Sequence, residues 1–322
     1  MNLRLYKPEV FQGNLTKKNY FEGWYFKHVT EDQSQAFSFI PGISLNENDP
    51  HVFIQVLNGL TGESDYISYE LPQFSWERRK LYLKIGKSVF TDEYIDLNIE
   101  GEKQRISGHI NYINTIRYPK KILSPGIMGW YSFVPFMECK HGIVSVNHDL
   151  KGSIVANGHL ISFNDGKGYI EKDWGRSFPE VWLWIQANNF LDRNSSFCFS
   201  VAKIPWMGKF FIGFIAFLYY NRKFYLFATY NHSVIKEIKR FGKSVILVLE
   251  NKQNTLRISC TVTTSGELKA PFIGRMSRRI KESIDSQVGL ALYNSDKEII
   301  YSDSSPRGGF EVIDEIFDYL DT

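Results

Sequence analysis

Hydrophobic and polar residues alternate in short runs along most of this chain, and turn-forming residues separate the runs. Residues 36–40, 52–57 and 81–85 are apolar or alternating, and clusters of Gly, Asn, Asp or Pro bound them. Residues 94–100 alternate regularly, and a further run follows at 105–112. Such runs recur about every 8–15 residues, which is typical of antiparallel β-strands in barrels or sandwiches. The pattern therefore predicts an all-β protein.

Helical spacing is confined to two short segments, 277–286 and 312–320, and we expect both to be packing helices. The most apolar stretch, 210–220, is about half as long as a membrane-spanning helix. Asn221-Arg222 follows it, and a second aromatic run comes next at 224–230. Two such runs around a short turn predict a β-hairpin.

Turn residues near the middle of the chain suggest where it divides. Asn-Gly at 157–158 and Asn-Asp-Gly at 164–166 separate two strand-rich halves. A half of this length suits a lipocalin-like barrel of about eight to ten strands. We therefore expect two lipocalin-like antiparallel β-barrel domains with few short helices, at residues 1–160 and 161–322.

Composition narrows the class of ligand. The 322 residues include 25 Phe, 18 Tyr and 7 Trp, together 16% of the chain, which suits a β-rich protein with an apolar cavity. The formal net charge of +3 is too small to indicate a nucleic-acid partner. One basic cluster, at 275–281, favours a solvated face, with acidic headgroups as the alternative. We expect a hydrophobic small-molecule ligand and at most peripheral contact with a membrane.

The cysteines and the N-terminus bear on the compartment. Cys139, Cys198 and Cys260 are far apart and form no CxxC motif, so we expect reduced, buried thiols. The N-terminal residues lack an apolar core long enough for a signal peptide. We therefore expect a cytoplasmic protein.

The run Gly166-Lys-Gly-Tyr-Ile-Glu-Lys-Asp-Trp-Gly175 carries the densest candidate chemistry. In a strand, Tyr169, Glu171 and Asp173 share one face. Two acids on one buried face repel each other, which raises the pKa of at least one and yields a general acid. The alternative is a barrel strand whose acids pair with neighbouring cations or solvent.

Two further tracts combine acids with large rings. The first is FEGWYFK at 21–27, and the second is PGIMGWYSFVPFMECKHG at 125–142. The histidines show no metal-ligand spacing, and there is no nucleophile elbow or nucleotide loop, so we expect neither a metal nor a cofactor. His141 and His148 are seven residues apart, so one regular strand places them on opposite faces.

Together these tracts, with GKGYIEKDWGRSFP and the following WLWIQ, resemble the tocopherol cyclase family. The resemblance implies two lipocalin-like domains, shared with a wider group that includes carotenoid hydratases. In those distant relatives a comparable tract reads aromatic, then Asp-His-x-Trp-Gly. Here Glu171 replaces the aspartate and Lys172 the histidine, which leaves open whether Glu171 or Asp173 is the acid.

The family reaction closes a chromanol ring on a prenylated quinol. An acid protonates the prenyl alkene, a phenol oxygen captures the tertiary cation, and aromatic faces stabilise that cation. The residues that we select for this chemistry are Glu171, Asp173, Tyr169, His141, Glu138 and Glu22. Those that we select for contact with the substrate are Trp24, Tyr25, Trp130, Tyr131, His148, Trp174, Trp182 and Trp184.

Two other functions use the same features. A non-catalytic lipocalin-like carrier of an isoprenoid or other lipid needs the aromatic cavity but no matched acid and base. A carbohydrate-active β-protein also uses aromatic walls and paired carboxyls, but it needs a wetter cleft than this apolar composition favours.

Overall fold

The computed structural model describes residues 3–135, 137–206 and 208–320. Phe136, in the middle of the second aromatic tract, lies outside the described residues. The strands are β1 Phe21–Val29, β2 Ala36–Asn46, β3 Asp49–Asn58, β4 Ser64–Tyr69, β5 Phe74–Trp76, β6 Tyr82–Ile85, β7 Ser88–Thr91, β8 Tyr94–Glu100, β9 Arg105–Ile116, β10 Cys139–Ala156, β11 His159–Ser162, β12 Lys167–Gly175, β13 Trp182–Ala187, β14 Ser196–Trp206, β15 Lys209–Tyr220, β16 Lys223–Ala228, β17 Val234–Phe241, β18 Ser244–Glu250, β19 Asn254–Phe272, β20 Arg275–Asn294 and β21 Ile299–Val312.

Among the described residues, the helices are five short 3-10 segments: η1 Leu3–Tyr6, η2 Leu71–Gln73, η3 Gly129–Phe133, η4 Thr229–Asn231 and η5 Asp314–Tyr319. No helix in the described ranges is long and apolar enough to cross a membrane. The fold is thus all-β with two large lipocalin-like antiparallel sheets, as the sequence predicted.

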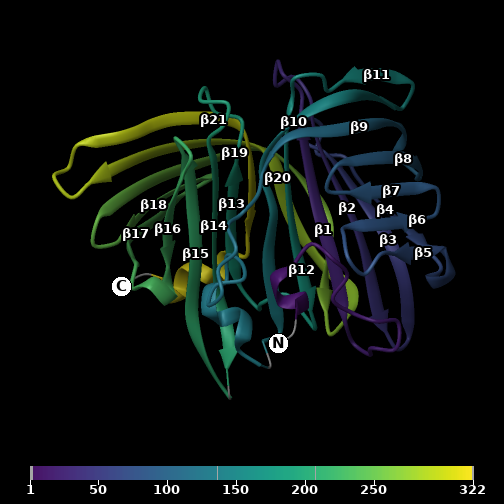
Figure 1. Ribbon diagram of the computed structural model, residues 1–322, viewed down its shortest axis with the longest axis horizontal. Coiled ribbons are helices and arrows are strands. Elements are labelled where there is room, and N and C mark those ends of the chain that lie inside the picture. The colour runs from purple at the N-terminus through teal and green to yellow at the C-terminus, as the bar shows by residue number, and fades with distance from the viewer. Residues whose placement is uncertain (1–2, 136, 207, 321–322) are drawn as a thin grey trace. The chain divides into compact units, whose positions relative to one another are not determined.

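The chain forms two compact units, which Figure 1 colours along the sequence. The first unit contains Met1–Phe178 and Gly266–Ile280, and the second contains Pro179–Ser265 and Lys281–Thr322. The first sheet has 12 strands, in the order β4-β3-β2-β1-β12-β10-β9-β8-β7-β6-β5, with β11 on β10. The second sheet has nine strands, in the order β16-β15-β14-β13-β21-β20-β19-β18-β17.

This division differs from the boundary expected at residues 160/161. Asn157 and Gly158 have φ angles of 49° and 86°, so the Asn-Gly pair is the turn of the β10–β11 hairpin. The next turn returns the chain to β12, which pairs with β10 in the same sheet. The turn chemistry therefore marks one hairpin and one connection between two strands that both pair with β10, all inside the first unit, and not a domain boundary.

The tip of the β19–β20 hairpin, residues 266–280, also belongs to the first unit. Gln55 of β3 fixes it with two hydrogen bonds: its Nε2 donates to the Lys269 carbonyl at 3.0 Å, and its Oε1 accepts from the Lys269 amide at 2.8 Å. Ser44 Oγ of β2 donates to the Gly274 carbonyl at 2.7 Å. These contacts tie a segment late in the chain to strands near its beginning.

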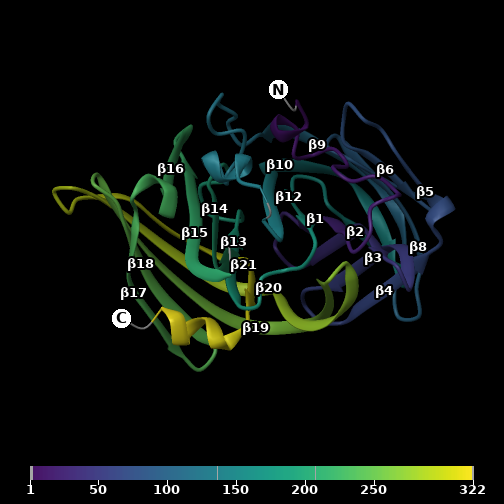
Figure 2. The same ribbon diagram turned by 90° about the horizontal axis from the view of Figure 1, so that it is seen from below.

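The first unit has its own core of buried hydrophobic side chains. Figure 2 shows the curved strands of its sheet, β1 to β10 and β12. Trp24 and Phe26 of β1 and Ile170 of β12 are fully buried members of this core. The N-terminal segment joins this core through Phe11, whose ring packs edge-on against Phe74 at 5.5 Å between centroids. The segment before β1 is therefore part of the packed interior.

The second unit has a separate core, and two predictions can be checked there. The β15–β16 hairpin is confirmed: Asn221 and Arg222 form its turn, with φ angles of 47° and 58°. The C-terminal helix is shorter than expected and of 3-10 type, and its buried Ile316 packs into this core.

The helix predicted at 277–286 is wrong. These residues lie within β20, where Ile280, Glu282 and Ile284 are buried at alternate positions. The two isoleucines four residues apart fit a helical stripe and a strand face equally well. Pairing with β21 decides in favour of the strand.

Candidate functional site

Three tracts distant in sequence become neighbouring strands in the first unit. The FEGWYFK tract forms β1, the acid tract forms β12, and the end of the mid-chain tract begins β10. Strand β12 lies between the other two: Asp173 pairs with Gly23 of β1 and with His141 of β10. The backbones of the three tracts therefore lie side by side in one sheet.

Strand alternation sorts the side chains of β12 onto two faces. Ile170 belongs to the core of the first unit and Trp174 packs against it, so we call this side the core face. Tyr169, Glu171 and Asp173 share the opposite side, which we call the acid face. The predicted grouping of these three side chains is therefore present.

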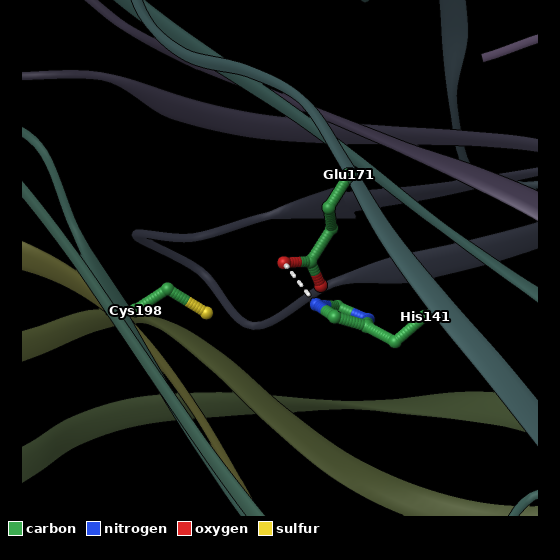
Figure 3. A group of neighbouring side chains, drawn as sticks. All are labelled: His141, Glu171 and Cys198. Atoms are coloured by element: carbon green, nitrogen blue, oxygen red, sulfur yellow. Dashed lines mark ion pairs between the residues drawn. The ribbon is translucent and has the colours of Figure 1, made fainter. Parts of the chain in front are cut away.

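On the acid face, four side chains form what we call the acid cluster: Tyr169, Glu171, Asp173 and His141. The Tyr169 hydroxyl donates to Oε2 of Glu171 at 2.6 Å. Nδ1 of His141 lies 3.0 Å from Oδ1 of Asp173, and its Nε2 lies 3.8 Å from Oε2 of Glu171. Figure 3 shows the imidazole facing the Glu171 carboxylate. One imidazole thus connects two carboxyl groups.

Burial differs between the two acids. The side chain of Glu171 is 7% exposed and that of Asp173 is 26% exposed, with His141 between them at 14%. When Asp173 accepts the bond from His141, Nδ1 carries the hydrogen and Nε2 directs a lone pair toward Glu171. The arrangement can therefore hold a proton at Glu171 and accept one at Nε2.

Two further groups lie beside His141. The His141 amide donates to Sδ of Met128 at 3.1 Å, one residue before η3. The Cys139 thiol lies on the same side, with Sγ 4.0 Å from Oδ1 of Asp173. Loss of hydration, followed by the charges of Asp173 and Glu138, raises the pKa of the Cys139 thiol well above its usual value. Cys139 is thus a neutral neighbour of the cluster.

The core face carries a different polar group. Lys172 Nζ forms an ion pair with Glu22, and both side chains are fully buried. The same Nζ donates to the carbonyls of Pro8 at 2.8 Å and Val10 at 2.6 Å. Burial lowers the pKa of Lys172 to about 8, while the charge of Glu22 opposes that shift. The pair holds the N-terminal segment against the core.

This group corrects part of the predicted site. Lys172 Nζ lies 4.5 Å from the ring centroid of Trp24 and 4.9 Å from that of Trp174. The two tryptophans and Glu22 therefore surround the buried ammonium group of Lys172 and lie on the face opposite the acid cluster. Glu22 and Trp24 were selected from the sequence to act in one site with Glu171. They do not share its face, because β1 also alternates between the two faces.

His148 is likewise on the core face, opposite His141 as its odd spacing predicted. Its Nδ1 lies 2.8 Å from the Ser145 hydroxyl, and its ring centroid lies 4.3 Å from that of Tyr112. The Tyr112 hydroxyl is 2.8 Å from Nε2 of His28. Burial lowers the pKa of His28 to about 3 and that of His148 well below its usual value. These are neutral core histidines.

The other predicted residues occupy several places. Tyr25 is directly opposite Glu171 on β1 and is buried, so it adds a ring to the acid face. Trp130 and Tyr131 belong to η3, where the Trp130 side chain is 50% exposed. The contact of Glu138 that connects it to β12 is made by its backbone: its carbonyl accepts a hydrogen bond from the Arg176 amide at 2.7 Å.

Trp182 and Trp184 are in β13 of the second unit. Nε1 of Trp182 donates to Oε2 of Glu311 at 3.0 Å. Both side chains lie on the face of β13 opposite Leu183 and Ile185, which belong to the core of the second unit.

Sequence reasoning missed the partners of the N-terminal segment and the role of Lys172. The available signal was a lysine whose same-face neighbours in the strand, Ile170 and Trp174, are apolar, with Glu22 near the start of another acid-containing strand. The pairing of β1 with β12 was needed to see that both point into one core. Imidazole and carboxylate are also metal ligands, and His141 and Glu171 lie close enough together to contribute one ligand atom each. The hydrogen bond between His141 and Asp173 is compatible with that role, because metal-bound histidines commonly make such a bond with their other ring nitrogen.

Comparison with known proteins adds the family. A family model described as tocopherol cyclase-like matches residues 101–313. The chain belongs to the tocopherol cyclase-like family. The matched range contains all four residues of the acid cluster, whereas Glu22 and Trp24 fall outside it.

Two curated plant proteins are similar to this family member. Tocopherol cyclase, chloroplastic, of Zea mays is 29% identical over 312 residues, covering 80% of this chain and 66% of the maize protein. A protein of Oryza sativa subsp. japonica named "Probable tocopherol cyclase, chloroplastic" is 29% identical over 148 residues, covering 44% of this chain and 31% of the rice protein. The chain thus spans less than two thirds of the length of either relative.

Solved structures support the fold. CghA with Sch210972 superposes with a TM-score of 0.56 at 9% identity, covering 91% of this chain and 88% of CghA. A candidate AttH of Nitrosomonas europaea superposes with a TM-score of 0.52 at 15% identity, covering 91% of this chain and 92% of that one. At these identities the likeness concerns the fold alone.

Proposed function

We propose that this family member catalyses the acid-dependent cyclisation of a prenylated quinol or a related isoprenoid to a chromanol. The observation that carries the proposal is the acid cluster, in which His141 connects Asp173 to Glu171. It lies within the range that matches the family model. General acid catalysis of this kind needs a buried carboxyl group and a base that returns the proton.

We assign the acid to Glu171. Its side chain is the less exposed of the two acids, and its second contact comes from a neutral phenol, that of Tyr169. Asp173 is already engaged by Nδ1 of His141, which suits an orienting role. These contacts and the deeper burial support Glu171 over Asp173, the choice that the sequence left open.

In the proposed reaction, the carboxylic acid of Glu171 transfers its proton to one carbon of the prenyl alkene. The tertiary cation forms at the other carbon, and the phenol oxygen of the substrate bonds to it. The phenol proton passes to Nε2 of His141 and from there back to Glu171. No electrons leave the substrate, so the product is an isomer of it and the protein is regenerated.

The acid face also offers aromatic rings to the cation. Tyr169 and Tyr25 flank Glu171 within the sheet, one along β12 and one across on β1. A well-placed ring stabilises a nearby cation by about 0.5–2 kcal/mol. We assign contact with the cation to these two tyrosines, of which Tyr25 was selected from the sequence for substrate contact together with Trp24 and Trp174.

Incubation of the purified protein with a prenylated hydroquinone in detergent tests the proposal. We expect a chromanol of unchanged mass, separated by chromatography and identified by its fragmentation. Glu171→Gln should slow this conversion by about 10²–10⁴, and Glu100→Gln, an exposed acid on β8, serves as the matched control. Unconverted substrate with the unaltered protein would contradict the proposal.

The alternative is a carrier that binds an isoprenoid without converting it. A carrier needs an apolar interior but gains nothing from an imidazole placed between two carboxyls. Tight binding of the hydroquinone, with no product and no effect of Glu171→Gln, would favour the carrier.

A further inference from the structure

A tight turn in the first unit presents two aliphatic side chains to solvent. Ile122 is 76% exposed and Leu123 is 77% exposed. The Lys121 amide donates to the Ser124 carbonyl at 2.8 Å, and the Ser124 amide donates to the Lys121 carbonyl at 3.0 Å. Ile122 and Leu123, which lie between them, therefore form the apex of a two-residue turn. Such turns favour Gly, Asn and Asp, and two adjacent aliphatic residues at the apex need another explanation.

The turn is anchored to the N-terminal segment. The Tyr6 hydroxyl donates to the Ile122 carbonyl at 2.5 Å, and Lys120 forms an ion pair with Glu9 at 3.0 Å. Lys7 Nζ in turn donates to the Arg79 carbonyl at 2.9 Å. Residues 4–9, 77–80 and 120–123 therefore form one continuous surface, which we call the docking edge.

The docking edge is strongly basic. Its basic residues outnumber its two acids, Glu9 and Glu77, and each acid already pairs with a lysine of the edge. The basic residues are Arg4, Lys7, Arg78, Arg79, Lys80, Lys120 and Lys121, all of them exposed. The net charge of the whole chain is only +3, so the docking edge holds a local excess of positive charge around its apolar turn.

We infer that the docking edge binds the surface of an anionic lipid bilayer, with Ile122 and Leu123 inserted among the headgroups. Basic residues near such a surface are attracted to acidic lipids, and aliphatic side chains beside them gain from burial at the acyl boundary. The cluster at 275–281 that the sequence singled out is a weaker candidate, because Arg279 pairs with Glu267 at 3.0 Å. The inference does not depend on the proposed cyclase activity.

The first unit contains a natural contrast. Leu160 is 73% exposed, a similar fraction to Ile122 and Leu123. It lies at an open cleft of about 870 Å³, whose lining includes Glu31, Asp32 and Glu63. An anionic surface repels such an acidic rim, so exposure alone does not make a docking site.

Co-sedimentation with vesicles tests the inference. We expect the full chain to bind vesicles of phosphatidylcholine with phosphatidylglycerol, and to bind pure phosphatidylcholine at least about tenfold more weakly. Binding to the anionic vesicles should weaken further as salt is raised. Ile122→Ser/Leu123→Ser should lower the partition coefficient about tenfold or more. Leu160→Ser is the matched control and should bind like the unaltered protein.

A charge variant separates the two contributions. Lys121→Glu should weaken binding to anionic vesicles by about tenfold and leave the weak binding to neutral vesicles unchanged. Thermal melting of each variant checks that the fold is retained. Binding unaffected by the Ile122/Leu123 change, equal loss with Leu160→Ser, or no binding to anionic vesicles would each overturn the inference. The vesicles contain no quinol, so these outcomes are independent of any turnover assay.

Discussion

Nδ1 of His141 lies 3.0 Å from Oδ1 of Asp173, across the pairing of β10 with β12. The other ring nitrogen faces Glu171, two residues earlier on the same strand. Two alternate positions of β12, Glu171 and Asp173, thus place a carboxyl group on either side of the His141 imidazole. This geometry gives the acids different surroundings and, we propose, different roles.

The first prediction concerns Glu171. Glu171→Gln keeps the shape of the side chain but removes the transferable proton, so turnover should fall by about 10²–10⁴. Substrate affinity should change little, and steady-state kinetics with equilibrium binding separates the two effects. His141→Ala should reduce turnover less, because water can accept the phenol proton. A larger loss with His141→Ala than with Glu171→Gln would contradict the assignment of the acid.

The second prediction concerns the buried pair on the core face. Lys172→Met leaves the Glu22 carboxylate without its ion-pair partner in a fully buried site. Removing one partner of such a pair costs about 3–5 kcal/mol in the free energy of unfolding. Lys172→Met/Glu22→Gln should recover part of this loss, because no uncompensated charge remains. Chemical denaturation measures the free energy of unfolding of both variants. An equal loss in the single and the double variant would contradict a dominant role for the unpaired Glu22 charge.

The third prediction concerns stability in acid. The pKa of His28 is about 3 in the folded protein and near 6.5 in an unfolded chain, because burial penalises the charged ring. Between these values the unfolded chain binds more protons, so stability falls as the pH drops from 6.5 toward 3. His148 adds to the same trend, since its pKa is also depressed.

Replacing the ring should reduce this slope. His28→Gln keeps a polar side chain near Tyr112 and removes one titrating group. The loss of unfolding free energy between pH 6.5 and pH 4.5 should be smaller in the variant by about 1.4 kcal/mol per pH unit at most. An unchanged slope in denaturation curves measured at both pH values would contradict the burial of a neutral His28.

The fourth prediction concerns Gly168, which leaves room for His148. A Cβ at this position would stand 2.1 Å from Nε2 of His148, inside a packed core. Gly168→Ala should therefore destabilise the first unit by about 1–3 kcal/mol, the usual cost of overpacking. Gly126→Ala is the matched control, because a Cβ there meets nothing within 4 Å. Similar melting temperatures for the two variants would contradict this account.

Much of the fold followed from alternation alone. The period of two at 94–100 matches β8, and the acid tract at 166–175 contains β12 with its three side chains on one face. The failures came where two structures share a pattern. Residues 277–286 fit a helical stripe, and Asn-Gly at 157–158 fits a linker as well as a hairpin turn.

The site was harder to predict because alternation fixes faces only within a strand. It groups Glu22 with Trp24 and it groups Tyr169 with Glu171, but it does not say which groups face each other. The register decides: Trp24 lies opposite Lys172, and Tyr25 lies opposite Glu171. A shift of one residue would have brought Trp24 to the acid face.

The origin of the hydrogen added to the prenyl chain tests the central claim most directly. In deuterium oxide, a prenylated hydroquinone should give a chromanol with one deuteron bonded to carbon in the new ring, at the alkene carbon that Glu171 protonates. Mass spectrometry and deuterium NMR would locate it, and Glu171→Gln should slow its appearance by the same factor as turnover. A chromanol formed in deuterium oxide without carbon-bound deuterium would contradict the account.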